Sequence, residues 1–334
     1  MQDNTTKPFY PPALQPGDTI GVFSSSLCGT AQQEKQVRYA MDFLEARGYH
    51  VKLGALSSMD AKRAWRAGSI AERAAEFNAL LRDPAVDCLM ASAGGCVSNS
   101  ILPYIDYAYL REHPKIIIGF SDITALLLGI YAQTGLTTFY GPNFSQFWRK
   151  PPVNEQVFAF MEPVLANAET PYTFPTPEEW TDENIHFHER HKYHMRKNAL
   201  RTLRGGIAEG RLIPCNLNTL DSIWGSPYMP EIRQGDILLL EDCKKDIETA
   251  ERSFSHLKLC GIFDKIGGLL IGKHIDQDDE GSGLTDVDLF LEVAGQFDFP
   301  ALAEFDCSHA SPMLTLPVGV RVRLDADRKE LVLL

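Results

Sequence analysis

A serine at the end of an apolar run is the first residue in this sequence that could act as a nucleophile. Ser121 lies in the segment GFSD, between an apolar run at residues 115–120 and a helical pattern at residues 122–133. A serine at such a strand-to-helix turn projects its hydroxyl from the edge of a sheet, where unpaired N–H groups of the helix start can face an oxyanion. The pattern therefore favours acyl-transfer chemistry at Ser121; the alternative is a serine that only caps the helix.

A glutamate and a histidine could supply the other groups that a serine hydrolase needs. Glu241 directly follows the apolar run DILLL, and His309 lies in FDCSHASPM, just after a short strand pattern. A carboxylate at a strand end can orient a histidine, and histidine suits general base catalysis because its pKa lies near neutrality. The alternatives are a solvated strand end for Glu241 and an ordinary polar loop residue for His309. The sequence alone does not show whether the three residues meet.

Two adjacent glycines could complete such a site. Gly94 and Gly95 follow the apolar run at residues 86–91, and glycine lets backbone N–H groups turn towards a ligand. Together with the N–H group of Asp122, they would bind the oxyanion of an acyl-transfer reaction. The alternative is a tight turn between a strand and a helix.

A histidine-rich run in the middle of the chain invites a metal-site interpretation. The run HFHERHKYH contains His186, His188, His191 and His194. Its spacing matches no common zinc signature, and it lies in an irregular region. We therefore predict a solvated loop, with no metal and no other cofactor.

Alternating strand and helix patterns indicate the fold that must position these residues. In the first half, apolar runs alternate with helical periodicity, which predicts a parallel sheet with helices on its faces. Strands are expected at residues 19–24, 50–53, 86–91 and 115–120, and helices at 32–47, 70–81 and 122–133. Ligands bind beyond the carboxyl ends of such strands, which is where Gly94, Gly95 and Ser121 fall.

The second half indicates another α/β unit. Residues 145–203 show no clean period, and we interpret 169–203 as a linker and long loop. A second domain then begins near residue 205. Its strands are expected at 236–240, 268–271, 302–305, 320–324 and 331–334, and its helices at 247–259 and 287–297.

Composition narrows the classes of function. The 334 residues suffice for two domains, and the formal net charge of -12 argues against a nucleic-acid partner, which would require basic stripes. The N-terminus has no basic start followed by an apolar run, and no stretch approaches ~18 apolar residues, so neither a signal peptide nor a membrane span is expected. The seven scattered cysteines form no CxxC pair and fit a reducing cytoplasm.

Several segments, in this order, resemble the LD-carboxypeptidase family of serine peptidases. They include GDTIGVFSSS, KIIIGFSDITALLLGIYAQTG, TFYGPN, CNLNTL, DILLLEDCKKD, LLIGKH and AEFDCSHASPMLTLPVGV, and the resemblance covers nearly the whole chain. It implies a Ser-Glu-His triad of Ser121, Glu241 and His309. It also implies a homodimer whose subunits have a flavodoxin-like N-terminal nucleophile domain (1–168), a linker and substrate loop (169–203) and a smaller β-rich α/β C-terminal domain (204–334).

The tracts ERSFSHLKL, GIFDKIGGLLIGKH and PTPEEWTDENIHFHE are similar to the subgroup that gives immunity to microcin C. That resemblance implies cleavage of the amide between an aspartyl residue and a modified adenylate. It assigns nucleobase stacking to Trp180, a substrate hydrogen bond to Asn218 and a contact with a carboxylate or phosphate to Lys245. Ile275 departs from the pattern, because relatives of this type carry an acidic residue there; the adjacent Asp276 could replace it.

We therefore expect a serine hydrolase that cleaves peptidyl- or aminoacyl-adenylate-like antibiotics. One alternative is a murein tetrapeptide LD-carboxypeptidase that releases the terminal D-Ala during cell-wall recycling. Another is a protein that only binds and sequesters the ligand, which the three filled triad positions argue against. Replacing Ser121 or Trp180 separates these alternatives.

Overall fold

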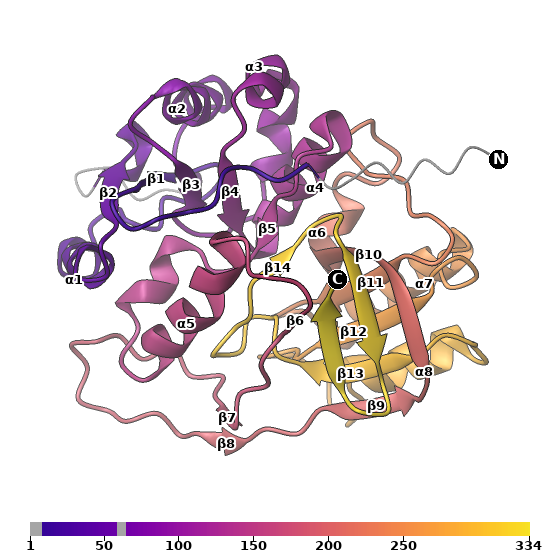
Figure 1. The fold of residues 1–334 in the computed structure, drawn as a ribbon. Helices are drawn as coiled ribbons and strands as arrows, with labels where there is room; N and C mark the ends of the chain where they lie inside the picture. Colours follow the sequence, from indigo (N-terminus) through magenta and orange to yellow (C-terminus); the bar gives the residue numbers. More distant parts are fainter. Residues whose placement is uncertain (1–8, 59–64) are drawn as a thin grey trace.

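The computed structural model describes residues 9–58 and 65–334. Residues 1–8, on which most of the expectation about a signal peptide rests, lie outside these ranges. Two large β-sheets flanked by helices dominate the described chain (Figure 1). The first sheet is built mainly from the indigo-to-magenta half of the chain, and the second mainly from its orange-to-yellow half.

In the described chain, the N-terminal sheet has six strands in the order β14-β5-β4-β3-β1-β2. Pairs among β1 to β5 are parallel, whereas β14 is antiparallel to β5. The order β2-β1-β3-β4-β5 is that of flavodoxin-like folds, so the expected fold class is confirmed. The strands are β1 (Thr19–Phe23), β2 (His50–Leu53), β3 (Cys88–Ala91), β4 (Ile116–Gly119), β5 (Phe139–Tyr140) and β14 (Leu316–Pro317).

Helices cover both faces of this sheet; in Figure 1, α1 and α5 lie below it and α2 and α3 above it. An apolar stripe explains the position of α1, because Val37, Ala40 and Leu44 are fully buried. Ser69 starts α2 with a capping box that Glu72 completes. The helices are α1 (Glu34–Glu45), α2 (Ile70–Arg82), α3 (Tyr107–Glu112), α4 (Thr124–Thr134) and α5 (Val153–Leu165). Short 3-10 helices lie between them: η1 (Ala55–Ser57), η2 (Ser98–Tyr104), η3 (Ser121–Ile123) and η4 (Phe144–Trp148).

The second sheet is mixed and has eight strands in the described chain, ordered β6-β16-β15-β10-β11-β12-β13-β9. Its central strands β10 to β13 are parallel, and its outer strands pair antiparallel. The strands are β6 (Tyr172–Thr173), β9 (Arg201–Arg204), β10 (Ile207–Asn216), β11 (Ile237–Glu241), β12 (Gly268–Gly272), β13 (Ala301–Phe305), β15 (Arg321–Asp325) and β16 (Glu330–Leu333). Helices α6 (Leu217–Asp221), α7 (Ile247–Leu259) and α8 (Asp286–Ala294) accompany it, and β7 (Glu179–Trp180) pairs with β8 (Arg196–Lys197) as a separate ribbon.

Some segments differ from the interpretation of the sequence. Residues 153–165 form helix α5 although they lie in the stretch without a clean period, where Pro163 inside the helix obscures the pattern. Strand β10 was not expected, because Pro214 argues against a strand interior. Helix α8 ends at Ala294, before Gly295, rather than at residue 297.

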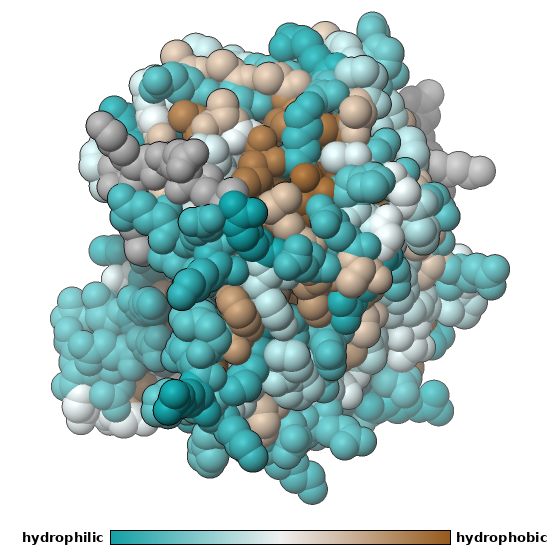
Figure 2. All heavy atoms as spheres, turned by 90° about the vertical axis from the view of Figure 1, so that its left-hand side faces the viewer, coloured by the Kyte–Doolittle hydropathy of each residue, from teal (hydrophilic) through white to brown (hydrophobic). Residues whose placement is uncertain are grey.

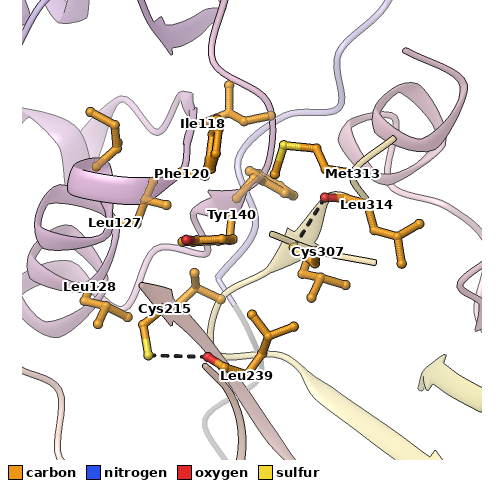
Figure 3. Close-up of a cluster of buried hydrophobic side chains, with 14 of the residues drawn as sticks. Ile118, Phe120, Leu127, Leu128, Tyr140, Cys215, Leu239, Cys307, Met313 and Leu314 are labelled. Carbon is orange, nitrogen blue, oxygen red and sulfur yellow. Dashed lines mark hydrogen bonds between the residues drawn. The ribbon is translucent and has the colours of Figure 1, made fainter. Parts of the chain in front are cut away.

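A buried apolar cluster joins the two sheets (Figure 3). Its labelled members are at most 4% exposed, and they come from both halves of the chain: Ile118, Phe120, Leu127, Leu128, Tyr140, Cys215, Leu239, Cys307, Met313 and Leu314. The backbone N–H of Asn216, at the end of β10, donates to Thr124 Oγ1 in α4 at 3.0 Å. The carboxyl ends of β4 and β10 therefore lie close together, which creates a site between the sheets.

The surface is that of a chain with an ordinary content of charged residues, 23%. The face in Figure 2 is largely hydrophilic, with apolar side chains gathered in its upper middle part. No helix of the described ranges has the length and apolar character needed to cross a membrane. All seven cysteines are unpaired, and Cys28, Cys88, Cys215 and Cys307 are buried.

Candidate active site

Ser121 occupies a strained turn directly after β4. Its φ angle is 65°, in the left-handed region that residues other than glycine rarely adopt. Neither η3 nor α4, both within the described ranges, has a side-chain cap, so the alternative that Ser121 caps the helix is wrong. A strained strand-to-helix turn is also how α/β-hydrolases expose their serine, although the sequence here is not GxSxG.

Gly94 lies against this turn. A Cβ atom at Gly94 would stand 3.1 Å from Ser121 Oγ and 3.7 Å from the backbone nitrogen of Asp122. A Cβ atom at Gly95 would instead overlap the side chain of Ser26 in the loop after β1. A side chain would therefore be crowded at both positions, most severely at Gly95, and the loop after β3 lies beside the N–H group of Asp122.

A buried polar network holds these loops together. The Asp122 carboxylate accepts hydrogen bonds from the N–H groups of Val97 and Ser98, each at 3.0 Å. The guanidinium of Arg73 is buried and donates to the carbonyl oxygens of Ser25 and Val97. Burial lowers the pKa of Arg73, and the nearby Asp122 carboxylate offsets part of this effect. This role could not be predicted, because Arg73 lies in a helix whose pattern is that of an ordinary amphipathic helix.

His309 and Glu241 form a hydrogen-bonded pair beside Ser121. The distance from His309 Nδ1 to Glu241 Oε2 is 2.6 Å. The ring of His309 also lies 4.8 Å, between centroids, from the ring of Phe120, the residue before Ser121. Burial by itself would lower the pKa of His309, but the adjacent carboxylate outweighs it and raises that pKa. This pair therefore favours the imidazolium, the form that a general base reaches during catalysis.

Two further side chains hold the Glu241 carboxylate. Tyr140 donates its hydroxyl proton to Oε1, and Asn216 donates from Nδ2 to the same oxygen at 3.1 Å. Burial would raise the pKa of Glu241, but His309 and these donors bring it below its usual value. The same Tyr140 hydroxyl accepts the backbone N–H of Ser121 at 3.2 Å. Hydrogen bonds through Tyr140 thus connect the turn of Ser121 to Glu241.

Trp180 lies in the 169–203 loop, close to the segment that carries His309. Its ring centroid is 5.0 Å from Cζ of Arg196 and 5.5 Å from Nζ of Lys273. Two backbone hydrogen bonds, of 2.8 and 2.9 Å, join Thr181 to Ser311. The loop is therefore anchored two residues after His309, which brings the predicted nucleobase platform to the same region of the molecule.

Asn218 contacts the start of the turn that follows Glu241, and Lys245 lies in that turn. The N–H group of Asn218 donates to Asp242 Oδ2 at 2.9 Å. Lys245 is half-buried, and its carbonyl oxygen accepts the N–H of Asp278 at 3.1 Å. Burial and the neighbouring Glu241 raise the pKa of Asp242. The backbones of both residues thus contact the segments beside the Glu241 end of β11.

The position that departs from the family pattern lies beside the same turn. Ile275 pairs with Cys243 in a short parallel bridge, and its carbonyl oxygen accepts the N–H of Lys244 at 3.0 Å. Asp276 is exposed and has a φ angle of 53°. The bridge places the Ile275 segment beside the chain that leaves Glu241.

The histidine-rich run shows short-range contacts within the 169–203 loop. His186 Nδ1 lies 3.8 Å from Glu189 Oε1, and the rings of His186 and His188 are 5.9 Å apart. Within residues 9–58 and 65–334, no group of three His, Cys, Asp or Glu side chains is arranged to hold a metal ion. His191 and His194 contribute their backbones to hydrogen bonds with Lys150 and Glu183.

Known proteins resemble this chain over nearly its whole length. A family model described as the LD-carboxypeptidase N-terminal domain matches residues 20–141, and one described as the LD-carboxypeptidase C-terminal domain matches residues 209–324. A relative from Vibrio cholerae serotype O1 is 45% identical over 320 residues, which is 95% of each chain. The microcin C7 self-immunity protein MccF of Escherichia coli is 43% identical over 329 residues, 97% of this chain and 95% of that protein.

Solved structures of MccF share the fold over 98% of both chains. Its complex with aspartyl sulfamoyl adenosine gives a TM-score of 0.93 at 43% identity, and its complex with glutamyl sulfamoyl guanosine 0.93 at 42%. An active-site mutant of MccF has a serine, an asparagine and a lysine replaced by alanine. Because both halves match the family models and the relatives align over nearly their full length, the chain belongs to the LD-carboxypeptidase family.

Proposed function

We propose that this protein is a serine hydrolase that cleaves the amide bond of peptidyl- or aminoacyl-adenylate-like antibiotics of the microcin C type and so confers self-immunity or resistance. The observation that carries the proposal is the His309–Glu241 pair beside the strained turn of Ser121. MccF, which has been solved with aspartyl and glutamyl sulfamoyl nucleosides, supports the substrate class.

The triad performs this reaction by acyl transfer. Ser121 Oγ attacks the acyl carbon while Nε2 of His309 takes the hydroxyl proton, and Glu241 stabilises the imidazolium from Nδ1. The N–H groups of Asp122 and of Gly94 or Gly95 bind the oxyanion. The C–N bond then breaks as His309 gives its proton to the leaving nitrogen.

Hydrolysis of the acyl-enzyme completes the cycle. A water molecule attacks the ester carbon and gives a proton to His309. The ester bond breaks, and that proton returns to the oxygen of Ser121. The products are a carboxylic acid and a free amine or sulfamoyl NH2 group, and the enzyme regains its initial state.

Three residues bind the substrate in this proposal. Trp180 stacks on the nucleobase, an interaction worth about 1–3 kcal/mol. Asn218 donates a hydrogen bond to the substrate, and Lys245 binds a carboxylate or phosphate group of the substrate. The asparagine and lysine replaced in the active-site mutant of MccF are of the same types.

We place the enzyme in the cytoplasm as a homodimer. The seven unpaired cysteines support a reducing compartment. The dimer rests on the family resemblance, and sedimentation equilibrium tests it directly. The mass of a single chain at micromolar concentration would contradict the dimer.

Mass spectrometry of the products tests the function. Purified protein is mixed with aspartyl sulfamoyl adenosine and, separately, with a murein tetrapeptide, and Ser121→Ala is the control. We expect release of aspartate from the adenosine compound and none from the mutant. An adenosine compound that stays intact but is bound tightly by both proteins would make the chain a sequestering binder.

The alternative is murein LD-carboxypeptidase activity. The matching family models support it because they are described as LD-carboxypeptidase domains. Release of D-Ala from the tetrapeptide alone would support it. In that case Trp180 would be a structural residue of the loop.

A further inference from the structure

Two buried charged side chains lie between the ribbon that carries Trp180 and the segment that carries His309. Lys273, directly after β12, donates from Nζ to Asp306 Oδ1 and to the carbonyl oxygen of Glu304. Both charged side chains are 2% exposed, and neither takes part in the proposed acyl transfer. Because apolar side chains in place of such a pair often leave a fold equally stable, stability alone does not explain these charges.

Lys273 also brings a buried cation to the ring of Trp180. Its Nζ lies 5.5 Å from the centroid of the indole ring, within the range of a cation–π contact, which is strongest when the cation is desolvated. A second cation, Arg196, has its Cζ 5.0 Å from the same centroid. The side chain of Arg196 is 45% exposed and pairs with Asp182 at 2.8 Å, so water screens its charge. Lys273 therefore makes the stronger contact with the indole.

Asp306, the other member of the pair, holds the backbone of the same ribbon. Its Oδ2 accepts a hydrogen bond from Nδ2 of Asn198 at 2.8 Å, and this Nδ2 also donates to the carbonyl oxygen of Pro177 at 2.9 Å. The N–H of Asn198 donates to the carbonyl oxygen of Glu178 at 2.8 Å. Asn198 thus joins the two chains at one end of the β7–β8 ribbon and ties them to Asp306. Because Trp180 lies in β7, one ion pair holds both its ring and its backbone.

The same ion pair is part of the segment that carries the proposed general base. Asp306 precedes His309 by three residues, and its carbonyl oxygen accepts the N–H of Leu314 at 2.8 Å, which closes the loop around His309. Lys273 and Asp306 directly follow the ends of the adjacent parallel strands β12 and β13. An indole held by this pair therefore keeps a fixed position relative to His309.

We propose that Lys273, kept in place by Asp306, is a positioning residue for nucleobase recognition, because it holds the indole of Trp180 in the orientation on which the base stacks. This inference rests on the proposed function and concerns substrate recognition in the same site. Trp180 is half-buried, so part of its side chain stays open to a ligand. An indole that is already ordered loses less entropy when the base binds, and such preorganisation raises affinity without a new contact.

Binding of adenosine monophosphate measures base recognition without any cleavage, and a structure of an MccF variant contains this nucleotide. Lys273→Met alone would leave Asp306 buried without its cation and destabilise the fold. The test variant therefore combines Lys273→Met with Asp306→Asn, which removes both charges and keeps an acceptor for Asn198. Calorimetry should give a dissociation constant about 5- to 30-fold above that of the wild type, the equivalent of one desolvated cation–π contact. An unchanged dissociation constant would overturn the inference.

A double-mutant cycle decides whether Lys273 acts through Trp180. The same two charge-removing substitutions are made in the Trp180→Ala protein. If Lys273 positions the indole, they should change the dissociation constant there by less than about twofold, the range of independent sites. An equal loss of affinity with and without the indole would mean that the ion pair supports the site in another way, and would overturn the inference.

Lys150→Met is the matched control, because Lys150 holds the same 169–203 loop at a different place. Its Nζ donates to the carbonyl oxygens of Glu189 and His191, each at 3.1 Å. We expect the control to keep the affinity for adenosine monophosphate within about twofold of the wild type. A loss as large as that of the test variant would mean that any loosening of the loop weakens binding, which contradicts a specific role of Lys273.

These binding measurements separate the inference from the hydrolytic function. If the wild-type protein does not bind adenosine monophosphate, the inference is overturned, whereas release of aspartate from aspartyl sulfamoyl adenosine would still support the proposed function. If the protein binds the nucleotide but releases no aspartate, the proposed function fails and the double-mutant cycle alone decides the inference.

Discussion

The hydroxyl of Tyr140 accepts the backbone N–H of Ser121 at 3.2 Å. The same hydroxyl donates its proton to Glu241, so one phenol supports both the turn of the proposed nucleophile and the carboxylate that orients His309. Burial and the charge of Glu241 raise the pKa of Tyr140, which keeps the proton on the phenol. Tyr140 is therefore a positioning residue.

Tyr140→Phe should lower kcat by about 10- to 100-fold with little change in KM, because a hydrogen bond to a charged group is lost. The free energy of unfolding should fall by about 1–3 kcal/mol, since a buried N–H and a buried carboxylate lose a partner. Steady-state kinetics and urea unfolding measure the two effects. Tyr131→Phe is the matched control, because its hydroxyl only accepts from Arg211 at 3.2 Å; an equal loss of kcat there would contradict the role of Tyr140.

The pair of His309 and Glu241 predicts the pH profile. Glu241 raises the pKa of His309, and only the neutral imidazole can take a proton from Ser121. The rise of kcat/KM with pH should therefore centre above the ordinary histidine value of about 6.5. Glu241→Gln should move this rise to lower pH and reduce the plateau. A rise at the same pH in both proteins would contradict the coupling.

The same pair predicts how stability depends on pH. The raised pKa of His309 stabilises the fold fully below the unfolded value of about 6.5, and this stability is lost as the pH rises through the folded value. The lowered pKa of Glu241 has the opposite effect: it stabilises the fold fully above the unfolded pKa of the carboxyl group. This stability is lost as the pH falls through the folded pKa. Urea unfolding from acid to alkaline pH measures both. If the stability of His309→Gln declines at alkaline pH as much as that of the wild type, His309 is not the source of this decline.

Gly94 and Gly95 should respond differently to the same substitution. In Gly94→Ala the new Cβ would stand 3.1 Å from Ser121 Oγ, so kcat should fall by about 10- to 100-fold through misplacement of the nucleophile. In Gly95→Ala the Cβ would overlap Ser26, so the fold should lose about 1–3 kcal/mol. Kinetics and thermal unfolding of both mutants give the comparison. The reverse pattern would exclude Gly94 from the oxyanion region.

Trp180→Ala should lower kcat/KM for aspartyl sulfamoyl adenosine by about 5- to 150-fold, the equivalent of one base stack. Cleavage of a substrate without a nucleobase should be spared. Trp180→Phe keeps an aromatic face and should retain most of the activity. If both substrates lose activity equally, Trp180 anchors the loop and does not bind the base.

Much of the fold could be predicted because its signals are local. Residues 247–259 form helix α7 at the predicted bounds, since Asp246 caps its start. Strand β4 and the turn at Ser121 follow from an apolar run that ends in GFSD. The pairing of Tyr140 with Glu241 was not predictable, because 101 residues separate them and a tyrosine in a short apolar run reads as core.

The burial of Arg149 could not be predicted for the same reason. Nothing around this residue distinguishes a buried cation from a solvated one, because burial depends on η4, on the 169–203 loop and on Ser311, 162 residues away. The resemblance to a family predicts substrate contacts for Trp180, Asn218 and Lys245, whereas the periodicity of a single sequence cannot distinguish these residues from their neighbours.

Strand β14, at residues 316–317, completes the sheet of the first half by pairing with β5. The first half on its own would therefore end in an uncovered strand edge, a template for association with other chains. During synthesis, the sheet that carries Ser121 must wait for almost the whole polypeptide before its last hydrogen bonds can form. Because β14 follows His309 by only a few residues, this edge is covered soon after His309 has been synthesised. The protein therefore closes its first sheet and assembles its site in the same late step.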